Sequence, residues 1–312
     1  MNILISGAGA VGAYFGGRLA EAGADVSVVC RSDYEEVKVK GFQISSVKGD
    51  FVFKPAQVLR SASEYQGRAD LIIVGSKVLP EIDVVSMIKD AVGPETVILL
   101  AQNGIDIEKD IHAAFPENEL LSAIIYIGCT KTAPGIIAHT GGPGSMTFGE
   151  FRHRKGGKTA QQLLELFGKT PCPAELVDNI QYFRWKKLLW NIPFNSISVL
   201  GGGLLTNQMT DRSHLENLCS GIMYEIIEVA HSVGIELAES LVSENIEYTR
   251  NFTPYATSML ADFRRSRPLE VEAIVGNVYR IASENNIAIP HIATLYALLA
   301  SVDKKKQESI NS

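Results

Sequence analysis

Short apolar runs alternate with amphipathic stretches along the first half of the chain. Apolar runs cover residues 2–6, 25–30, 70–75 and 96–101, and the first two are separated by an amphipathic pattern that extends to residue 22. Apolar runs of this length, bounded by turn residues, are typical of buried strands, and strands that alternate with helices form parallel sheets. The pattern therefore predicts an α/β domain.

The pattern changes further along this half. An apolar run covers residues 120–128, and two shorter runs, 136–140 and 146–149, flank the glycine-rich segment 141–144. Two short strands joined by a glycine-rich turn predict an antiparallel extension of the sheet. A last strand-like segment at residues 174–177 completes the domain, which we expect to span residues 1–178.

The second half has a helical period of about 3.6 residues almost throughout. The pattern predicts helices over residues 180–200, 212–233, 237–250, 254–265, 269–285 and 291–302. We therefore expect an all-α domain over residues 179–312. An α/β domain followed by an all-helical domain is expected to form a cleft between the two, a common setting for a small-molecule site.

Composition removes several classes of protein. The 312 residues are 46% apolar and 21% charged, the balance of an ordinary globular chain, and a net charge of −6 argues against a nucleic-acid-binding surface. The four cysteines are scattered and the six histidines lack metal-ligand spacing, so we expect reduced thiols and no metal site. The opening residues lack the basic flank of a signal peptide, which favours a cytoplasmic location.

An uncharged stretch from Leu188 to Thr210 is long enough to span a bilayer. It contains Asn191, Pro193 and Asn195, however, and amide side chains are costly in lipid. A buried helix that carries functional amides therefore fits better than a membrane span.

A glycine-rich motif follows the first predicted strand and opens the first predicted helix. It reads Gly7-Ala8-Gly9-Ala10-Val11-Gly12. In this GxGxxG setting Gly7 permits the tight turn, Gly9 lets a pyrophosphate approach the backbone, and Gly12 lets helix and strand pack closely. The motif predicts a Rossmann-type dinucleotide-binding domain, with the phosphates at the N-terminus of the helix.

Three polar residues follow predicted strands and could face the dinucleotide. Arg31 stands where NAD-preferring proteins place an acidic residue, and a guanidinium suits a 2′-phosphate, so NADP is favoured over NAD. Lys77 and Asn103 follow the next two strands, whose carboxyl ends are where ligands bind. The alternatives are a solvated loop cation for Arg31, a solvated residue at a helix start for Lys77 and a plain Asn-Gly turn for Asn103.

A second group of polar residues lies in the helical half. Lys187, Asn191 and Asn195 are spaced four residues apart, so they share one helix face. Burial beside an apolar segment would shift the pKa of Lys187 toward use as an acid or base, although a lysine that only snorkels from a buried helix gives the same pattern. Further on, Ser258 precedes Glu270, which either complements a helix dipole or meets Lys187 or a substrate hydroxyl.

Together these motifs resemble the ketopantoate reductase (2-dehydropantoate 2-reductase) family over nearly the whole chain. The resemblance rests on the glycine loop, Arg31, Lys77, Asn103-Gly104, the segment 185–195 with Lys187, Asn191 and Asn195, the segment 258–270 and the segment 286–290. The lysine–asparagine–asparagine helix and the block that ends at Glu270 are far more specific than the glycine loop.

The resemblance implies the reduction of ketopantoate to (R)-pantoate with NADPH, on the route to pantothenate and coenzyme A. It implies that Lys187 is the general acid and that Glu270 holds the substrate hydroxyl. Asn191, Asn195 and Ser258 would bind the substrate, and Asn103 would lie between nicotinamide and substrate. The glycine loop, Arg31 and Lys77 would bind the cofactor.

Three alternatives remain open. Trp190 is bulkier than the residue that the family often has, which could reshape the pocket and favour another 2-oxo acid on the same scaffold. A non-catalytic NADP-binding sensor would keep the glycine loop but need neither Lys187 nor Glu270. A glycerol-phosphate-type dehydrogenase would need several cationic side chains that converge on the phosphate of its substrate. We expect a small-molecule substrate and neither a nucleic-acid nor a membrane partner, and a homodimer is compatible with the sequence.

Overall fold

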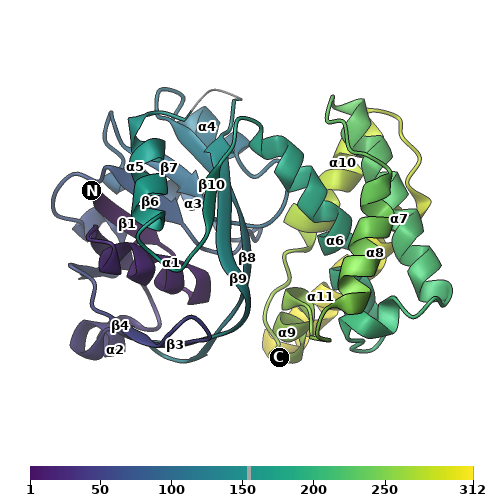
Figure 1. Cartoon of the computed structure of the whole chain (residues 1–312), viewed down its shortest axis with the longest axis horizontal. Helices are drawn as coiled ribbons and strands as arrows, with labels where there is room; N and C mark the ends of the chain where they lie inside the picture. Colours follow the sequence, from purple (N-terminus) through teal and green to yellow (C-terminus); the bar gives the residue numbers. More distant parts are fainter. Residues whose placement is uncertain (153–155, 312) are drawn as a thin grey trace. The chain divides into compact units, whose positions relative to one another are not determined.

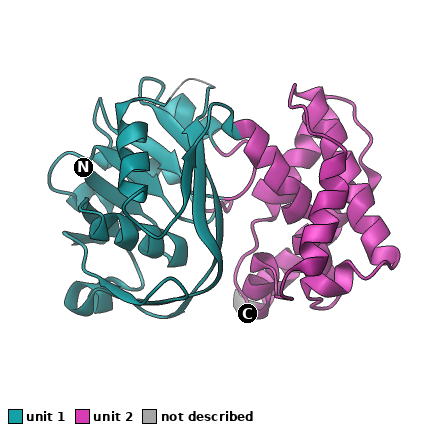
Figure 2. Cartoon of the chain, in the orientation of Figure 1, with its two compact units in different colours: residues 1–77, 82–102, 108–180 teal, residues 78–81, 103–107, 181–312 magenta. Residues whose placement is uncertain are grey.

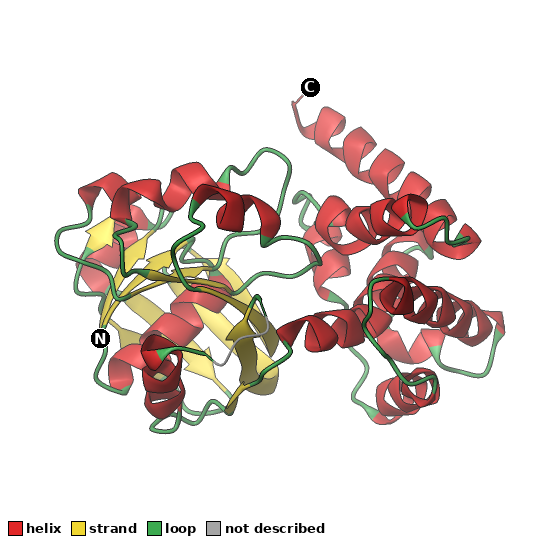
Figure 3. Cartoon of the chain, turned by 90° about the horizontal axis from the view of Figure 1, so that it is seen from above, coloured by secondary structure: helices red, strands yellow, loops and turns green. Residues whose placement is uncertain are grey.

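The computed structural model describes residues 1–152 and 156–311, and the chain divides into two compact units (Figure 2). Unit 1 comprises residues 1–77, 82–102 and 108–180, and unit 2 comprises residues 78–81, 103–107 and 181–312. Two short segments of the first half therefore belong to unit 2, although each follows a strand of unit 1. Strands gather in unit 1, whereas unit 2 is helical (Figure 3).

In the described part of unit 1, one sheet has the strand order β4-β3-β9-β8-β7-β6-β1-β2-β5, with β10 paired to β9. The strands are β1 (Asn2–Ser6), β2 (Asp25–Val29), β3 (Phe42–Ser46), β4 (Phe51–Phe53), β5 (Val58–Leu59), β6 (Leu71–Val74), β7 (Val97–Leu100), β8 (Leu120–Ala133), β9 (Ile136–Glu150) and β10 (Ala174–Leu176). The strands β2, β1, β6 and β7 are parallel, and Ser6 pairs with both Val29 and Val74, so their carboxyl ends align. The Rossmann-type α/β prediction is confirmed.

The helices of unit 1 are α1 (Ala10–Glu21), α2 (Tyr34–Lys40), α3 (Val84–Ile88), α4 (Lys109–Ala114) and α5 (Lys158–Phe167). The mixed sheet curls around α1, which packs against β2, β4, β8 and β9 (Figure 1). Its buried side chains include Tyr14, Phe15 and Leu19, and they meet Ile3 and Ile5 of β1 in one apolar core. The sheet thereby fixes the start of α1 beside the end of β1.

The antiparallel extension is longer than the sequence predicted. The segment 141–144, predicted as a turn between two short strands, lies within β9, and the chain reverses at residues 134–135 instead. The glycines interrupt the pairing of β8 with β9 without ending it, since the register shifts between Tyr126 and Gly128 and again before Cys129. Glycine within a strand often marks such a bulge, so the prediction of a turn there was wrong.

Unit 2 is built from helices, as predicted. They are α6 (Ile180–Leu200), α7 (His214–Ser232), α8 (Ser240–Asn251), α9 (Ser258–Arg264), a π-helix (Glu272–Gly276) that continues as α10 (Asn277–Glu284), and α11 (Pro290–Asn311). Helix α7 lies beside α8 and α11 (Figure 1). Leu188, Leu189 and Phe194 of α6 are fully buried in the core that these helices share.

The uncharged stretch 188–210 is divided between three structures. It runs along α6 through Pro193, turns at residues 201–203 and continues in a short 3₁₀ helix, Thr206–Met209. None of the helices in the described residues is both long and apolar enough to cross a membrane. The stretch is uncharged because α6 packs its apolar side chains into the core of unit 2.

A buried carboxylate holds the start of α11. Glu225 of α7 accepts hydrogen bonds from the backbone N–H of His291 at 3.0 Å, the backbone N–H of Ile292 at 2.9 Å and the Nδ1 atom of His291 at 2.7 Å. Pro290 opens the helix, so these donors belong to its first turn, where no intrahelical acceptor exists. Glu225 therefore caps α11 from a neighbouring helix.

We expect Glu225→Ala to lower the free energy of unfolding by about 2 kcal/mol, because the first-turn donors of α11 lose their acceptor. Urea unfolding followed by circular dichroism measures the change. Glu228→Ala, on an exposed position of the same helix, is the matched control and should change stability by less than about 0.5 kcal/mol. Equal effects of the two substitutions would contradict the capping role.

Candidate active site

The glycine loop of unit 1 is shaped by close backbone packing. Gly7 has φ +83°, and a Cβ atom there would lie 2.6 Å from the backbone N of Ser76. A Cβ at Gly12 would lie 2.9 Å from the carbonyl oxygen of Gly7, whereas one at Gly9 would meet nothing within 4 Å. Glycine is therefore required at Gly7 and Gly12 by packing, and the space beside Gly9 is open.

The open space lies at the N-terminus of α1. Gly9 is the N-cap residue, and no side chain caps this end of the helix. The first N–H groups, those of Ala10, Val11 and Gly12, precede the first intrahelical bond, which runs from Ala13 N to the Gly9 carbonyl oxygen at 2.9 Å. Uncapped N–H groups at the positive end of a helix dipole bind phosphate. These features fit the pyrophosphate of a dinucleotide.

The two predicted cofactor cations also lie at the carboxyl edge of the sheet. Arg31 is exposed and comes two residues after the end of β2, and Ala8 of the glycine loop donates to the carbonyl of Val29 at 3.2 Å. Lys77 is partly buried and comes three residues after β6. The strand register thus places both lysine and arginine beyond the strand ends that flank the glycine loop.

Lys187 and Asn103 meet within unit 2. The Nζ atom of Lys187 donates a hydrogen bond to Oδ1 of Asn103 at 2.9 Å. Lys187 lies on α6, and Asn103 lies in the segment 103–107, which follows β7. The structure therefore brings together two residues that the sequence places 84 positions apart.

Burial lowers the pKa of Lys187 to about 7. Desolvation is the largest cause, because burial disfavours the charged ammonium. The guanidinium of Arg184, one helical turn earlier on α6, lowers the pKa further, and the carboxylate of Glu270 partly opposes both effects. A lysine with this pKa can give up and recover a proton near neutral pH, as a general acid must.

The sequence analysis missed the residues that hold Asn103 in place. Arg184 is fully buried and donates from Nη1 to the carbonyl of Gly104 at 2.9 Å. Ile105 donates its backbone N–H to the carbonyl of Ala273 at 3.1 Å, and Asn277 donates to the carbonyl of Ile105 at 2.6 Å. The segment 103–107 is therefore fastened to α6 and to the helix after Glu270.

Gly104 makes this attachment sterically feasible. Its φ is +109°, and a Cβ atom there would lie 2.6 Å from the carbonyl oxygen of Ala273. Any other residue would push the segment away from the π-helix, and with it Asn103 from Lys187. The Asn-Gly pair is thus more than a plain turn. The sequence signal for it was the glycine itself, which only the structure connects to Ala273.

Glu270 lies two residues before the π-helix. Its Oε1 atom accepts a hydrogen bond from the backbone N–H of Val78 at 3.0 Å, so it holds the other short segment, 78–81, in unit 2. Its charge also acts on Lys187. Single π-turns within helices occur often at functional sites. Lys187 therefore interacts with two residues of unit 2: it donates a hydrogen bond to Asn103, and the charge of Glu270 raises its pKa.

The two asparagines of α6 share the face that carries Lys187. Asn191 and Asn195 are 6% and 1% exposed. The Oδ1 atom of Asn195 accepts from the backbone N–H of Met259 at 3.4 Å, which fixes α9 beside α6. A buried contact between the hydroxyls of Ser198 and Thr257, 2.7 Å apart, makes a second attachment.

Ser258 begins α9 directly after its N-cap residue Thr257, and its side chain is exposed. It precedes Met259, whose N–H contacts Asn195. Ser258 is therefore one residue away from the backbone contact between α9 and α6.

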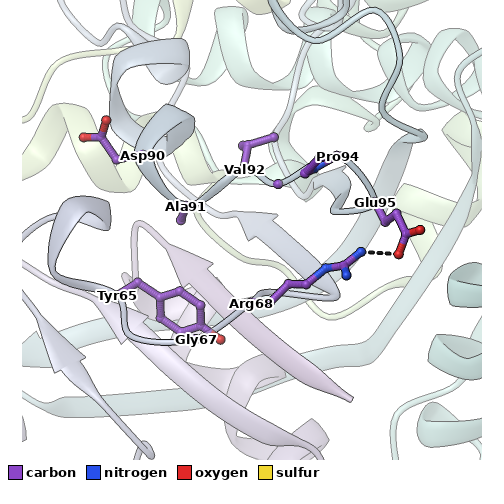
Figure 4. Close-up of a pocket in the computed structure, with 9 residues that line it drawn as sticks. Tyr65, Gly67, Arg68, Asp90, Ala91, Val92, Pro94 and Glu95 are labelled. Carbon is purple, nitrogen blue, oxygen red and sulfur yellow. Dashed lines mark hydrogen bonds and ion pairs between the residues drawn. The ribbon is translucent and has the colours of Figure 1, made fainter.

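Other features of the described residues do not form a second site of this kind. No three His, Cys, Asp or Glu side chains gather there as they would around a metal ion. A surface hollow of about 440 Å³ in unit 1 is lined by Tyr65, Arg68 and Glu95 among others, and Arg68 pairs with Glu95 across it (Figure 4). None of the predicted site residues lines this hollow.

Two family models match the chain. The model described as "Ketopantoate reductase PanE/ApbA" matches residues 3–153, and the model of the C-terminal domain of the same family matches residues 179–303. The chain belongs to the ketopantoate reductase family. It is therefore an oxidoreductase of the NAD(P)-dependent kind.

Individual relatives agree with this assignment. A 2-dehydropantoate 2-reductase from Nostoc sp. is 31% identical over 97% of this chain and 95% of its own length. Among solved structures, a 2-dehydropantoate 2-reductase from Methylococcus capsulatus is 41% identical with a TM-score of 0.93, and the match covers 98% of each chain. One from Geobacter metallireducens is 30% identical with a TM-score of 0.89, over 96% of this chain and 99% of that one.

We expect the side chain of Lys187 to titrate with a pKa of about 7, well below the ordinary value for a lysine, because burial and Arg184 disfavour its charged form. Nuclear magnetic resonance of protein labelled with ¹³C at the lysine ε-carbons measures the midpoint, and Lys187→Met assigns the signal. Glu270→Gln keeps an acceptor for Val78 but removes the charge, so it should lower the midpoint further. A midpoint near the ordinary lysine value of about 10.4 would contradict the geometry.

Proposed function

We propose that the protein reduces 2-dehydropantoate (ketopantoate) to (R)-pantoate with NADPH, a step of pantothenate and coenzyme A biosynthesis. The family assignment and the names of the relatives from Nostoc and Methylococcus support the substrate. The observation that carries the proposal is the ammonium of Lys187, which has a pKa of about 7 and is held 2.9 Å from the Asn103 amide oxygen.

The glycine loop and the cations of unit 1 would hold the cofactor. The N–H groups at the start of α1 would bind the pyrophosphate, and the space beside Gly9 would let it approach. Arg31 would bind the 2′-phosphate, and Lys77 would contact neighbouring atoms. Bound NADPH supplies the hydride that is added to C2 of the substrate.

Lys187 would donate the proton of the reaction. As the ketone oxygen gains negative charge, a cation fixed beside it stabilises the transition state more than the ground state. The Nζ–H bond breaks, the proton passes to the oxygen, and Lys187 is left neutral, a form that its burial favours. The Asn103 amide oxygen orients the ammonium throughout.

The remaining residues would recognise the substrate. Because the Oδ1 atom of Asn195 already accepts from Met259, its amino group is the end that can donate to a carboxylate or hydroxyl. Asn191 and the exposed hydroxyl of Ser258 would act beside it. Glu270 would accept a hydrogen bond from the substrate hydroxyl while it holds the segment 78–81 through Val78.

Other 2-oxo acids are the substrates that most need comparison. A D-mandelate dehydrogenase whose structure contains NADH and anilino(oxo)acetate has the same fold, with 24% identity and a TM-score of 0.83. In this chain the indole of Trp190, next to Asn191, is stacked on Phe194 and Tyr255 with centroids 5.0 and 5.9 Å away. An aromatic 2-oxo acid therefore belongs among the test substrates.

The decisive experiment is NADPH oxidation with ketopantoate, compared with pyruvate, 2-oxoisovalerate, phenylglyoxylate and dihydroxyacetone phosphate. We expect the highest kcat/KM for ketopantoate, because its hydroxyl and carboxylate match the donors and acceptors of the lysine–asparagine face. A higher kcat/KM for another 2-oxo acid would reassign the substrate. Tight NADPH binding without turnover of any of these compounds would favour a non-catalytic NADP-binding sensor.

We expect Lys187→Met to lower kcat by more than about 100-fold, the usual scale for the loss of a general acid. The dissociation constant of NADPH, measured by its fluorescence, should change by less than about threefold, because Lys187 acts on the substrate. Lys186→Met, at the neighbouring position of α6, is the control and should leave kcat near its original value. A variant of Lys187 with normal kcat would exclude this residue from the mechanism.

A further inference from the structure

A lysine from a distant strand reaches the residues that follow β2. The Nζ atom of Lys131, on β8, lies 2.6 Å from Oδ1 of Asp33 and donates to the hydroxyl of Ser32 at 3.1 Å. Two residues earlier on β8, the thiol of Cys129 contacts the carbonyl of Ala10 at 3.5 Å. Strand β8 therefore passes beside the glycine loop and places Lys131 next to Arg31-Ser32, all within unit 1.

Both carboxylate oxygens of Asp33 accept hydrogen bonds from other residues of the protein. Asp33 is 2% exposed, its Oδ1 atom also accepts from Ser32 Oγ at 2.7 Å, and its Oδ2 atom accepts from the backbone N–H of Gly135 at 3.3 Å. Burial alone would raise the pKa of Asp33, but the hydrogen bonds from Lys131, Ser32 and Gly135 outweigh it and hold the pKa below its ordinary value. Asp33 is therefore a buried anion with its partners in place.

The position of this anion matters for cofactor choice. NAD-binding proteins of this fold use an acidic residue after the second strand to bind the ribose hydroxyls, and a carboxylate there repels a 2′-phosphate. Asp33 follows the second strand, but it points into the protein and is paired with Lys131. With Lys131 in place, Arg31, Lys131 and Asp33 carry one net positive charge; without Lys131 they carry none.

Arg31 is the cation available at the surface of this group. Its side chain is exposed and forms no ion pair within residues 1–152 and 156–311. The Lys131 side chain is about a quarter exposed, and its ammonium contacts the Ser32 hydroxyl, whose one proton is donated to Asp33. Arg31 and Lys131 are thus the two cations of this group that can donate to a phosphate, one in the segment after β2 and the other in contact with it.

We propose that Lys131 is a specificity residue for a 2′-phosphorylated adenine nucleotide: it neutralises Asp33 and, with Arg31, forms the receptor for the 2′-phosphate. The inference rests on the proposed use of NADPH and assigns a residue of β8 to that preference. Lys131 acts in two ways, as a donor to the phosphate and as the counter-ion that keeps the buried carboxylate from repelling it.

Isothermal titration of the full chain with adenosine 2′,5′-bisphosphate and with adenosine 5′-monophosphate tests the inference without catalysis, because the two ligands differ only in the 2′-phosphate. For Lys131→Met we expect about a tenfold loss of affinity for the bisphosphate and less than about a twofold change for the monophosphate. Lys38→Met is the matched control, since Lys38 is an exposed lysine of the adjacent α2 that contacts the Tyr34 hydroxyl.

A double variant separates the two effects of Lys131. Asp33→Asn combined with Lys131→Met removes the buried carboxylate together with its counter-ion, so it should recover part of the lost affinity for the bisphosphate. It also avoids an unpaired buried charge, so it keeps the test valid where the single variant fails to fold. Arg31→Ala gives the reference for loss of a direct phosphate contact.

The outcomes distinguish this inference from the proposed function. Equal losses for both ligands in Lys131→Met, or no loss for either, would overturn the role of Lys131 while leaving an NADP preference intact. A double variant that binds the bisphosphate no better than Lys131→Met would overturn the neutralising role. If the unmodified chain binds the two nucleotides equally, the preference for NADP is wrong and the inference fails with it.

Discussion

The candidate active site depends on a buried guanidinium that ties a loop to a helix. Arg184 lies one turn before Lys187 on α6, and its hydrogen bond to the Gly104 carbonyl fixes the loop that carries Asn103. The same guanidinium repels the ammonium of Lys187. Arg184 therefore both positions Asn103, which accepts from Lys187, and lowers the pKa of Lys187. Burial of Lys187 is the larger cause of its lowered pKa, and Arg184 adds to it.

Glycine is what permits such close contact in both units. At Gly7 and at Gly104 the backbone has a positive φ, and in each case a Cβ atom would collide with the backbone of another segment at 2.6 Å. The first contact sets the loop at the start of α1 and the second sets the loop that carries Asn103. Chemistry in each unit therefore depends on a position where only a hydrogen atom fits.

Much of this arrangement could be predicted from the sequence, because it follows from periodicity and from local motifs. The strand before the glycine loop is of this kind, since residues 2–6 form one apolar run. The lysine–asparagine face of α6 is another example, since its three residues recur every four positions from 187 to 195. The contacts of Arg184 with Gly104 and of Glu270 with Val78 join segments 80 and 192 residues apart, and no local pattern encodes them. The glycines of β9 misled the prediction because a bulge and a turn use the same residue type.

Each unit contains a lysine that interacts with a carboxylate, and the strength of the interaction differs between Lys131 in unit 1 and Lys187 in unit 2. In unit 1 Lys131 lies 2.6 Å from the carboxylate of Asp33, and this contact helps to hold the pKa of Asp33 below its ordinary value. In unit 2 the carboxylate of Glu270 counts for less at Lys187 than burial and the nearby guanidinium do. A group that binds a phosphate must keep its charge, whereas a group that transfers a proton must be able to lose it. The strength of each carboxylate interaction accordingly matches the chemistry proposed for each lysine.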